Sequence, residues 1–377
     1  MAGGRDAYTR SGVDVAAGER AVELMRASVA STHRPEVLGG LGGFGSAVAI
    51  PPGFREPVIV SPTDGVGTKT AIAAAVGRFD TIGVDLVAMC ADDVVCTGAE
   101  PLAFLDYIAV GKLDPFHVAE LVAGIADGCR QAGCALVGGE TAEHPGLMEA
   151  DEFDLAGFCI GVGERDRLLD GTAARAGDAI VGLASSGLHA NGYSLVRALV
   201  ASEGLDLHEP FQALLRRVLG DAAAEALLRA EPNHAMATLG EVLLAPTRIY
   251  ALDLLAIRAA LAADGTEIGG MAHITGGGLP GNVPRALPSD LGARLDPGSW
   301  PIPAVMRLLG AIGGLEDDEL RATFNGGLGM VVVVPAGAAG TAVRMAEDRG
   351  VVAWVVGEVV EAAALGGARY AEEGRRA

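Results

Sequence analysis

The chain has 377 residues, of which 50% are hydrophobic and 20% are charged, and its formal net charge is −20. This length predicts two domains, because single hydrophobic cores stop growing beyond roughly 250–300 residues. The negative charge argues against a nucleic-acid surface, which needs clustered Lys and Arg, and no apolar run reaches the roughly 18 residues that predict a membrane span.

The composition also bears on the compartment. The start of the chain lacks the apolar core of a signal peptide, so we expect a cytoplasmic protein with no membrane partner. The five cysteines are odd in number and include no CxxC pair. Such cysteines are more often reduced core residues than metal ligands or nucleophiles.

The first half of the chain alternates between helix-like and strand-like segments, after an amphipathic stretch at 18–32. Period-two apolar runs predict strands, and a 3.6-residue period predicts helices. One helix has clear end signals, since Asp114 can cap it, Pro115 suits its first position and Gly133 ends it. The expected strands are 56–61, 101–111, 134–139 and 153–163, and the expected helices are 68–79, 81–98 and 115–133.

The apolar periodicity weakens at 164–178, where we expect the domain boundary, giving domains 1–168 and 169–377. The second half resumes the alternation and includes a helical insertion without chemistry at 205–240. Its expected strands are 179–187, 271–275, 330–335 and 351–359, and its expected helices are 192–201, 247–263 and 341–350. The predicted fold class is therefore α/β, in the mixed-sheet α+β sense, with a sheet and helical cover in each domain.

Five glycines fall within residues 39–45, interrupted only by Leu41 and Phe44. This density gives backbone N–H groups free access to an anion, and it is equally the ordinary material of a flexible connector. The spacing does not match a dinucleotide-binding fingerprint. Both interpretations stay open from these residues alone.

A second glycine turn, SPTDGVGTKT, follows the first predicted strand. It is not a P-loop, because Thr68 separates Gly67 from Lys69 and the earlier glycine of that motif is missing. Asp64 has the chemistry to hold Mg²⁺, and Lys69 has the chemistry to steady a phosphate as a point charge. The alternative is a solvated β-turn with an exposed pair of charges.

The predicted helix at 81–98 carries three carboxylates on an otherwise apolar sequence. Asp85 and Asp92 are seven residues apart and share a face, and Asp93 lies about 80° round from Asp85 at 3.6 residues per turn. Like charges at this spacing favour a cation, and hard oxygen ligands suit Mg²⁺. A solvated helix face is the alternative, although no Lys or Arg is interleaved there.

Two further turns join a predicted strand to a predicted helix. In SSGLHANGYSL, Ser185, Ser186, His189 and Asn191 add side-chain donors to a junction whose N–H groups point at an anion, and His189 is a candidate acid or base. A helix cap with a surface histidine is the alternative. The third glycine turn, at 275–278, raises the expectation that these loops meet over one cleft.

Residues Asp93 to Pro101 fit the signature DxxxxGAxP, which resembles that of a superfamily of ATP-dependent enzymes that phosphorylate an oxygen, nitrogen or selenium atom of a small substrate. From about Ser11 to Val360 the chain resembles, more narrowly, the phosphoribosylformylglycinamidine cyclo-ligase family. The blocks that carry this resemblance, in order, are RPEVLGGLGGFGS, TDGVGTK, FLDYIAVGKLD, LVGGETAEHPG, GFCIGVGE, SSGLHANGYSLVR, LLAPTRIY, HITGGGLPGNVPR and TFNGGLGM.

The resemblance implies a homodimer whose N-terminal domains contribute strands to a shared β-barrel, with a C-terminal α/β domain beside each. It implies that ATP and Mg²⁺ convert formylglycinamidine ribonucleotide to aminoimidazole ribonucleotide, ADP and phosphate. Asp64 and Asp93 would bind the metal, and Lys69, Asp93 and His189 would be catalytic. The implied nucleotide-binding residues are Gly42, Gly43, Phe44, Gly45, Asp64, Gly65, Gly67, Thr68 and Lys69. The implied substrate-binding residues are Ser185, Ser186, Gly187, His189, Asn191, Thr275, Gly276 and Gly277.

Two positions depart from the family pattern. Asp92 stands where the family commonly has asparagine, and Gly326 replaces a residue that is often larger. Other members of the superfamily fit less well: a selenophosphate synthetase would need a cysteine near the first glycine segment, whereas the first cysteine is Cys90. A thiamine monophosphate kinase would lack SSGLHANGYSL in this form, and the synthase of the preceding purine step is usually far longer or needs partner subunits. The alternative that is not an enzyme is an inactive ATP-binding or structural dimer.

Overall fold

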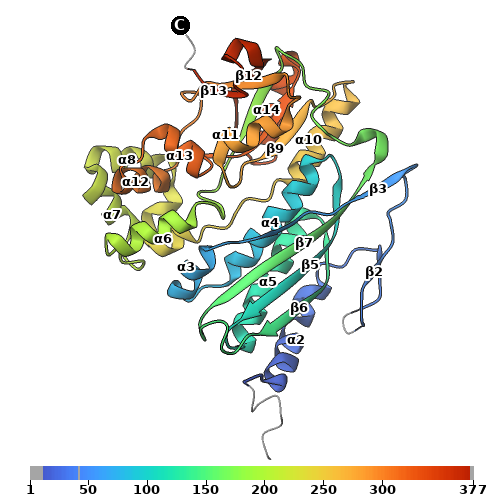
Figure 1. Cartoon of the computed structure of the whole chain (residues 1–377), viewed down its shortest axis with the longest axis vertical. Helices are drawn as coiled ribbons and strands as arrows, with labels where there is room; N and C mark the ends of the chain where they lie inside the picture. Colours follow the sequence, from blue (N-terminus) through green and yellow to red (C-terminus); the bar gives the residue numbers. More distant parts are fainter. Residues whose placement is uncertain (1–11, 41–42, 374–377) are drawn as a thin grey trace, which may run out of the picture.

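The computed structural model of the chain describes residues 12–40 and 43–373, which form two main β-sheets with helices packed on them (Figure 1). The first sheet has the strand order β3-β7-β5-β6, with β4 also paired to β7. The helices of this half are α2 (Val15–Ala30), α3 (Lys69–Val76), α4 (Asp80–Cys96) and α5 (Pro115–Ala132). Its strands are β1 (Val37–Leu38), β2 (Ala47–Val48), β3 (Pro57–Val60), β4 (Thr63–Gly65), β5 (Glu100–Val110), β6 (Ala135–Glu143) and β7 (Phe153–Glu164).

Helix α5 shows how local chemistry sets these bounds. The side chain of Asp114 accepts a hydrogen bond from the backbone N–H of Phe116 at 2.8 Å, Pro115 occupies the first turn, and Gly133 ends the helix with φ 76°. Helix α4 is buried almost all round, because it lies between α5 and strand β7 of the sheet. The sequence-based expectations for both helices are confirmed.

Two faces of the first sheet differ in their cover. On one face, β7 glycines admit α4 closely: a side chain at Gly161 would overlap Val94 of the helix. On the opposite face, Phe158 is 41% exposed and Tyr107 is 36% exposed. Within the described residues this sheet is open rather than a closed barrel, and its outer face carries apolar side chains.

The second sheet has the strand order β13-β10-β12-β8-β11-β9. Its strands are β8 (Ala179–Ala184), β9 (Gly270–His273), β10 (Leu291–Leu295), β11 (Leu328–Val334), β12 (Ala353–Glu361) and β13 (Tyr370–Glu372). Its helices are α6 (Tyr193–Ser202), α7 (Phe211–Leu219), α8 (Asp221–Ala230), α9 (Leu239–Leu243), α10 (Ala251–Ala263), α11 (Gly278–Asn282), α12 (Ala304–Gly313), α13 (Asp317–Thr323) and α14 (Ala339–Asp348). Figure 1 shows α6, α7, α8 and α12 gathered at one side of this half.

Most expected elements of the second half are present, including helices within 205–240. The helix expected at 247–263 begins later, at Ala251, because the backbone N–H groups of Thr247 and Tyr250 are bound by carboxylates of α4. Strands β10 and β13 and helices α12 and α13 were not expected from the sequence. No helix in the described ranges is both long enough and apolar enough to cross a membrane.

Candidate functional site

A carboxylate pair and a histidine meet where the two sheets approach each other. Asp64 lies on β4, Asp93 on α4 and His273 on β9. Oδ1 of Asp93 lies 3.1 Å from Nδ1 of His273, and Oδ1 of Asp64 accepts a hydrogen bond from the N–H of Gly65 at 2.7 Å. Burial, with a smaller contribution from nearby Asp93, raises the pKa of Asp64. Both aspartates were predicted from the sequence, whereas His273 was not, and its signal was its place directly before the third glycine turn.

A cavity of about 370 Å³ opens beside this group, lined by Asp93, His273, Ser61, Asn282 and Arg285 among others. Nε2 of His273 is buried and has no hydrogen-bond partner among the described residues. Arg285, whose guanidinium donates to the side chain of Asn282 at 3.0 Å, brings a positive charge to the wall of the cavity. The cavity therefore offers an imidazole nitrogen and a positive charge to an anionic ligand, and the carboxylate of Asp93 to a cation.

The donor set suits Mg²⁺. Two carboxylates at a cavity are typical of Mg²⁺ bound together with substrate phosphates, since this ion keeps several waters and rarely has an all-protein cage. In the described part of the chain no three His, Cys, Asp or Glu side chains form a ready-made metal cluster. A cation held by Asp64 and Asp93 would thus take its other ligands from water and from the bound substrate.

The three acids of α4 do not share one site, which corrects the expectation drawn from their spacing. Asp85 is paired with Lys69, and Asp92 accepts a hydrogen bond from the N–H of Tyr250 at 2.9 Å. Burial raises the pKa of Asp92 to about 7. Only Asp93 faces the cavity, because segments distant in the sequence supply the partners of the other two.

Lys69 lies away from solvent. Its side chain is 0% exposed, and Nζ has Oδ2 of Asp85 at 2.7 Å and the carbonyl oxygens of His189 and Ala245 at 2.9 and 2.8 Å. The alternative of a solvated turn with an exposed charge is therefore wrong for Lys69. In this arrangement the N–H groups of the ammonium face protein oxygens, and none points toward a phosphate.

His189 is also buried, at 0% exposure, so the alternative of a surface histidine is wrong. Its Nε2 accepts a hydrogen bond from the backbone N–H of Ser186 at 3.1 Å, and its Nδ1 has no partner among the described residues. Burial lowers the pKa of His189 well below its usual range, so the imidazole is neutral at physiological pH. The side chain contacts its own loop and lies against Gly329 of β11, and it does not line the cavity.

The glycine turns do come together, as their positions at strand ends predicted. The hydroxyls of Thr68 and Ser194 lie 3.3 Å apart, which joins the 61–70 turn to the 185–195 loop. A side chain at Gly276 would lie 3.9 Å from Oδ1 of Asn191, which places the third turn against the same loop. Gly67 and Gly277 have φ values of 63° and 90°, so these turns need glycine.

Besides Nδ1 of His189, two polar atoms of the 185–195 loop are buried without partners among the described residues, Oγ of Ser185 and Nδ2 of Asn191. The neighbouring Ser186 is engaged, since its hydroxyl donates to the carbonyl of Pro246 at 2.7 Å. Unsatisfied buried polar atoms are rare in native proteins, so such groups point to a ligand. The loop thus presents Ser185 and Asn191 as candidate contacts.

The first glycine segment lies elsewhere. Gly42 is outside the described residues, and Gly43, Phe44 and Gly45 line a separate cavity of about 870 Å³, between α2 and the strands β5 and β6. The register across the sheet pairs Asp64 with Gly157, Gly157 with Asp106 and Asp106 with Gly139. At about 4.8 Å per strand, Gly139 lies about 14 Å from Asp64. Within one chain the segment therefore does not cover Asp64 and Asp93.

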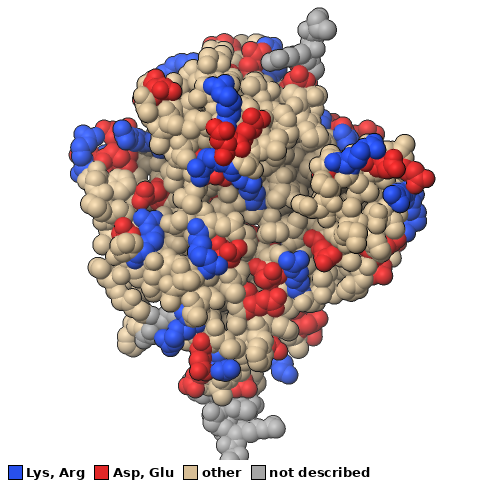
Figure 2. All heavy atoms as spheres, turned by 180° about the vertical axis from the view of Figure 1, so that it is seen from behind, with Lys and Arg blue, Asp and Glu red and all other residues tan. Residues whose placement is uncertain are grey.

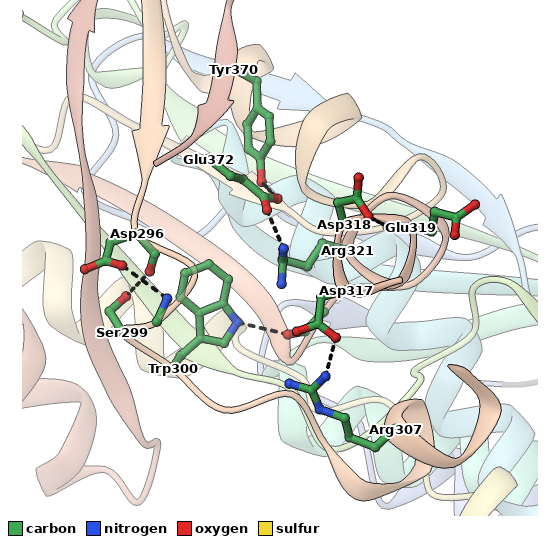
Figure 3. Close-up of polar contacts among 12 residues, drawn as sticks. Asp296, Ser299, Trp300, Arg307, Asp317, Asp318, Glu319, Arg321, Tyr370 and Glu372 are labelled. Carbon is green, nitrogen blue, oxygen red and sulfur yellow. Dashed lines mark hydrogen bonds and ion pairs between the residues drawn. The ribbon is translucent and has the colours of Figure 1, made fainter. Parts of the chain in front are cut away.

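The turn that contains Gly326 contacts the 185–195 loop and holds it in place. Nδ2 of Asn325 donates to the carbonyl of Gly187 at 2.8 Å. Figure 3 shows the neighbouring contacts, in which Nε of Arg321 lies 2.7 Å from Oε2 of Glu372 on the last strand. Gly326 has φ 60°, and a side chain there would overlap the stem of Arg321. The positive φ and the close approach of Arg321 therefore explain why residue 326 is a glycine.

Comparisons with known proteins agree with this architecture. Residues 49–163 match the N-terminal domain of AIR synthase related proteins, and residues 175–367 match their C-terminal domain. Among solved structures, a thiamine-monophosphate kinase from Stenotrophomonas maltophilia K279a aligns with a TM-score of 0.63 and 19% identity, over 95% of this chain and 97% of its own. The hydrogenase maturation protein HypE in complex with ATP aligns with a TM-score of 0.62 and 19% identity, over 99% and 93%. These two likenesses concern the fold.

Relatives of higher identity extend over nearly the whole chain. A phosphoribosylformylglycinamidine cyclo-ligase of Sorangium cellulosum (strain So ce56) is 51% identical over 94% of this chain and 95% of its own length. Its counterpart in Geobacillus kaustophilus (strain HTA426) is 48% identical over 98% and 99%. The chain therefore belongs to the phosphoribosylformylglycinamidine cyclo-ligase family of AIR synthase related proteins.

Proposed function

We propose that this protein closes the imidazole ring of aminoimidazole ribonucleotide in purine biosynthesis, using ATP and formylglycinamidine ribonucleotide and releasing ADP and phosphate. The observation that carries the proposal is the identity of 51% over 94% of the chain with a relative of that name. The clustering of Asp64 with Asp93 and His273, of which the last two line a cavity between the two sheets, supports it.

The chemistry explains why such a site needs few catalytic side chains. An amide oxygen is a poor leaving group, so the γ-phosphoryl group is transferred to the formyl oxygen of the substrate, which gives an iminophosphate. The neighbouring amidine nitrogen then attacks that carbon, the five-membered ring closes and inorganic phosphate leaves. Phosphoryl transfer of this kind depends on positioning and charge neutralisation more than on covalent help from the protein.

Asp64 and Asp93 are the residues that would hold Mg²⁺, which when bound neutralises charge on the phosphates. His273 orients Asp93 through the contact of 3.1 Å between Nδ1 and Oδ1. Arg285 lines the same cavity and adds the positive charge that a chain of net charge −20 needs for an anionic ligand. On the face that Figure 2 shows, basic side chains lie beside acidic ones and form no basic patch that could attract an anion.

Ser185, Ser186, Gly187, Asn191 and the turn Thr275 to Gly277 are proposed to bind formylglycinamidine ribonucleotide. The support is the unpartnered Oγ of Ser185 and Nδ2 of Asn191, and the nearness of Gly276 to Asn191. Gly65, Gly67 and Thr68 are proposed to contact the nucleotide, because they share the turn of Asp64.

A homodimer is proposed because the outer face of the first sheet is apolar. Ile59, Tyr107 and Phe158 are exposed on it, and burial of such a face is worth about 25 cal/mol per Å². A second copy would also explain how the predicted nucleotide contacts Gly42, Gly43, Phe44 and Gly45 could be made. Within one chain Gly43, Phe44 and Gly45 line a cavity with Gly139, which lies about 14 Å from Asp64 along the sheet. A cytoplasmic location is part of the same proposal.

The test is release of ADP by the purified protein. We expect release only when Mg²⁺ and formylglycinamidine ribonucleotide are both present. Turnover of ATP without the ribonucleotide would contradict the proposed reaction. Binding of Mg-ATP without any turnover would favour the alternative of an ATP-binding protein without catalysis.

A further inference from the structure

Lys69 and Asp85 form an ion pair that is closed off from solvent. Both side chains are 0% exposed, and Nζ lies 2.7 Å from Oδ2. Oδ1 of Asp85 accepts hydrogen bonds from the backbone N–H and the hydroxyl of Thr247, at 2.7 and 2.5 Å. Burial lowers the pKa of Lys69 and raises the pKa of Asp85, while the attraction between the two charges opposes both shifts.

The same ammonium group links the two halves of the chain. It donates hydrogen bonds to the carbonyl oxygens of His189 at 2.9 Å and of Ala245 at 2.8 Å. The ring of Tyr193 also faces it, with Nζ 5.5 Å from the ring centroid. An ammonium group has three N–H donors, so three oxygen neighbours within 3 Å leave none for a phosphate oxygen.

The carbonyl of His189 matters because this residue has an unusual backbone conformation. Its φ is 61°, and it is the sole non-glycine residue with positive φ in the ranges 12–40 and 43–373. Such a conformation costs of order 1–3 kcal/mol and persists when its surroundings hold it. The carbonyl oxygen of His189 accepts a hydrogen bond from Lys69, and its imidazole accepts one from the N–H of Ser186. The ring also occupies space that a side chain at Gly329 would fill.

We propose that the buried pair of Lys69 and Asp85 is a positioning device for the 185–192 loop, and that Lys69 does not contact the phosphates of a bound nucleotide. The pair belongs to α3 and α4 of the first half, whereas the loop and Ala245 belong to the second. The pair thus sets where Ser185 and Asn191 stand relative to Asp64 and Asp93. The inference rests on the proposed function only for the identity of the ligand of this loop.

The sequence offers a direct test, because Lys69 and Lys112 are its two lysines and Lys112 is exposed. The native protein is treated with an amine-reactive acetylating ester and analysed by mass spectrometry. We expect Lys112 to be modified and Lys69 to stay unmodified both with and without Mg-ATP, whereas both react in urea. Reaction of Lys69 in the free protein, with protection by Mg-ATP, would overturn the proposal.

A kinetic test uses Lys69→Met combined with Asp85→Asn, which removes both charges and so leaves no lone buried charge. The matched control is Arg78→Met with Asp80→Asn, an exposed pair of 2.9 Å at the corner between α3 and α4. We expect the control to behave as wild type. The buried double variant should keep its affinity for Mg-ATP within about threefold and raise KM for the ribonucleotide at least about tenfold.

Other outcomes separate the claims. An unchanged KM in the folded double variant, or a loss of Mg-ATP affinity with unchanged KM, would refute the positioning role. If the double variant does not fold, the acetylation pattern decides the question on the wild-type protein. A wild type that binds Mg-ATP but never turns over the ribonucleotide would refute the proposed function, and the acetylation result would still test the placement of Lys69.

Discussion

Oδ1 of Asp93 and Nδ1 of His273 lie 3.1 Å apart, although 180 residues separate them in the sequence. Asp93 comes from the buried helix α4, and His273 ends strand β9 of the second sheet. The contact joins the signature DxxxxGAxP to the third glycine turn. It makes the carboxylate of Asp93 part of a site that both halves of the chain build.

Asp93→Asn should lower kcat at least about tenfold, equivalent to about 1.4 kcal/mol of transition-state stabilisation, because the amide is a poorer ligand for Mg²⁺. Asp92→Asn is the matched control, since Asp92 is the adjacent residue but faces the N–H of Tyr250. We expect the control to retain near wild-type kcat. Full activity of Asp93→Asn in the ADP-release assay would remove Asp93 from the mechanism.

His273→Gln should weaken Mg²⁺-dependent turnover through the orientation of Asp93. We expect a rise in the Mg²⁺ concentration needed for half-maximal rate of about 10-fold, in the range found when a partner of a metal ligand is lost. The measurement is a magnesium titration of the steady-state rate. His144→Gln serves as control, because His144 contacts Tyr107 on the outer side of the first sheet. An unchanged titration would show that Asp93 needs no such partner.

Asp106→Asn should stabilise the protein more at pH 8 than at pH 5. Burial raises the pKa of Asp106 to about 7 from the usual 3.8. The folded state therefore binds a proton more tightly than the unfolded state, and stability is lost as pH rises from about 4 through about 7. The gain of the variant over wild type should be larger at pH 8 than at pH 5 by roughly 2–3 kcal/mol.

Urea unfolding at the two pH values measures this difference. Glu140 and Glu143, which line the same cavity as Asp106, stay unchanged in the variant. Asp151→Asn, at an exposed position, is the control and should show no such pH dependence. Equal gains at both pH values would mean that Asp106 is ionised in the folded protein with its ordinary pKa.

Phe158→Asp should disrupt the proposed homodimer. The side chain lies on the apolar outer face of the first sheet, and a charge there would be desolvated on association. Sedimentation analysis should show a shift toward monomer at micromolar concentration. Phe116→Asp, at a more exposed site at the start of α5, should leave the association unchanged. If wild type is monomeric at every concentration, the sheet face is not a dimer interface.

Glu372→Gln should loosen the last strand. Arg321 is almost fully buried and is paired with Glu372, so removal of the charge leaves a guanidinium without its carboxylate (Figure 3). We expect a loss of about 1–3 kcal/mol in the free energy of unfolding and faster proteolysis of the C-terminal residues. Glu373→Gln is the control, since its contact with Arg294 is long, at 4.0 Å, and exposed. Equal stability of the two variants would contradict this prediction.

The sequence alone determined most of the helices and strands. Helix α5 followed from Asp114, Pro115 and Gly133, because capping and backbone preferences act over a few residues. The glycine turns were identified for the same reason. The roles of Asp64 and Asp93 as oxygen ligands stay a prediction from their residue type. Elements without such local signals, such as α12 and β13, were missed.

Only the tertiary structure decided what each ionisable group faces. Asp85, Asp92 and Asp93 lie within about 100° of one another in a helical projection, yet one meets Lys69, one meets the N–H of Tyr250 and one meets His273 and a cavity. Lys69 and His189 have the residue types of a catalytic site, and burial gives them partners that hold a loop in place. The physical reason is that burial and charge pairing depend on segments brought together from distant parts of the chain, which periodicity and spacing do not record.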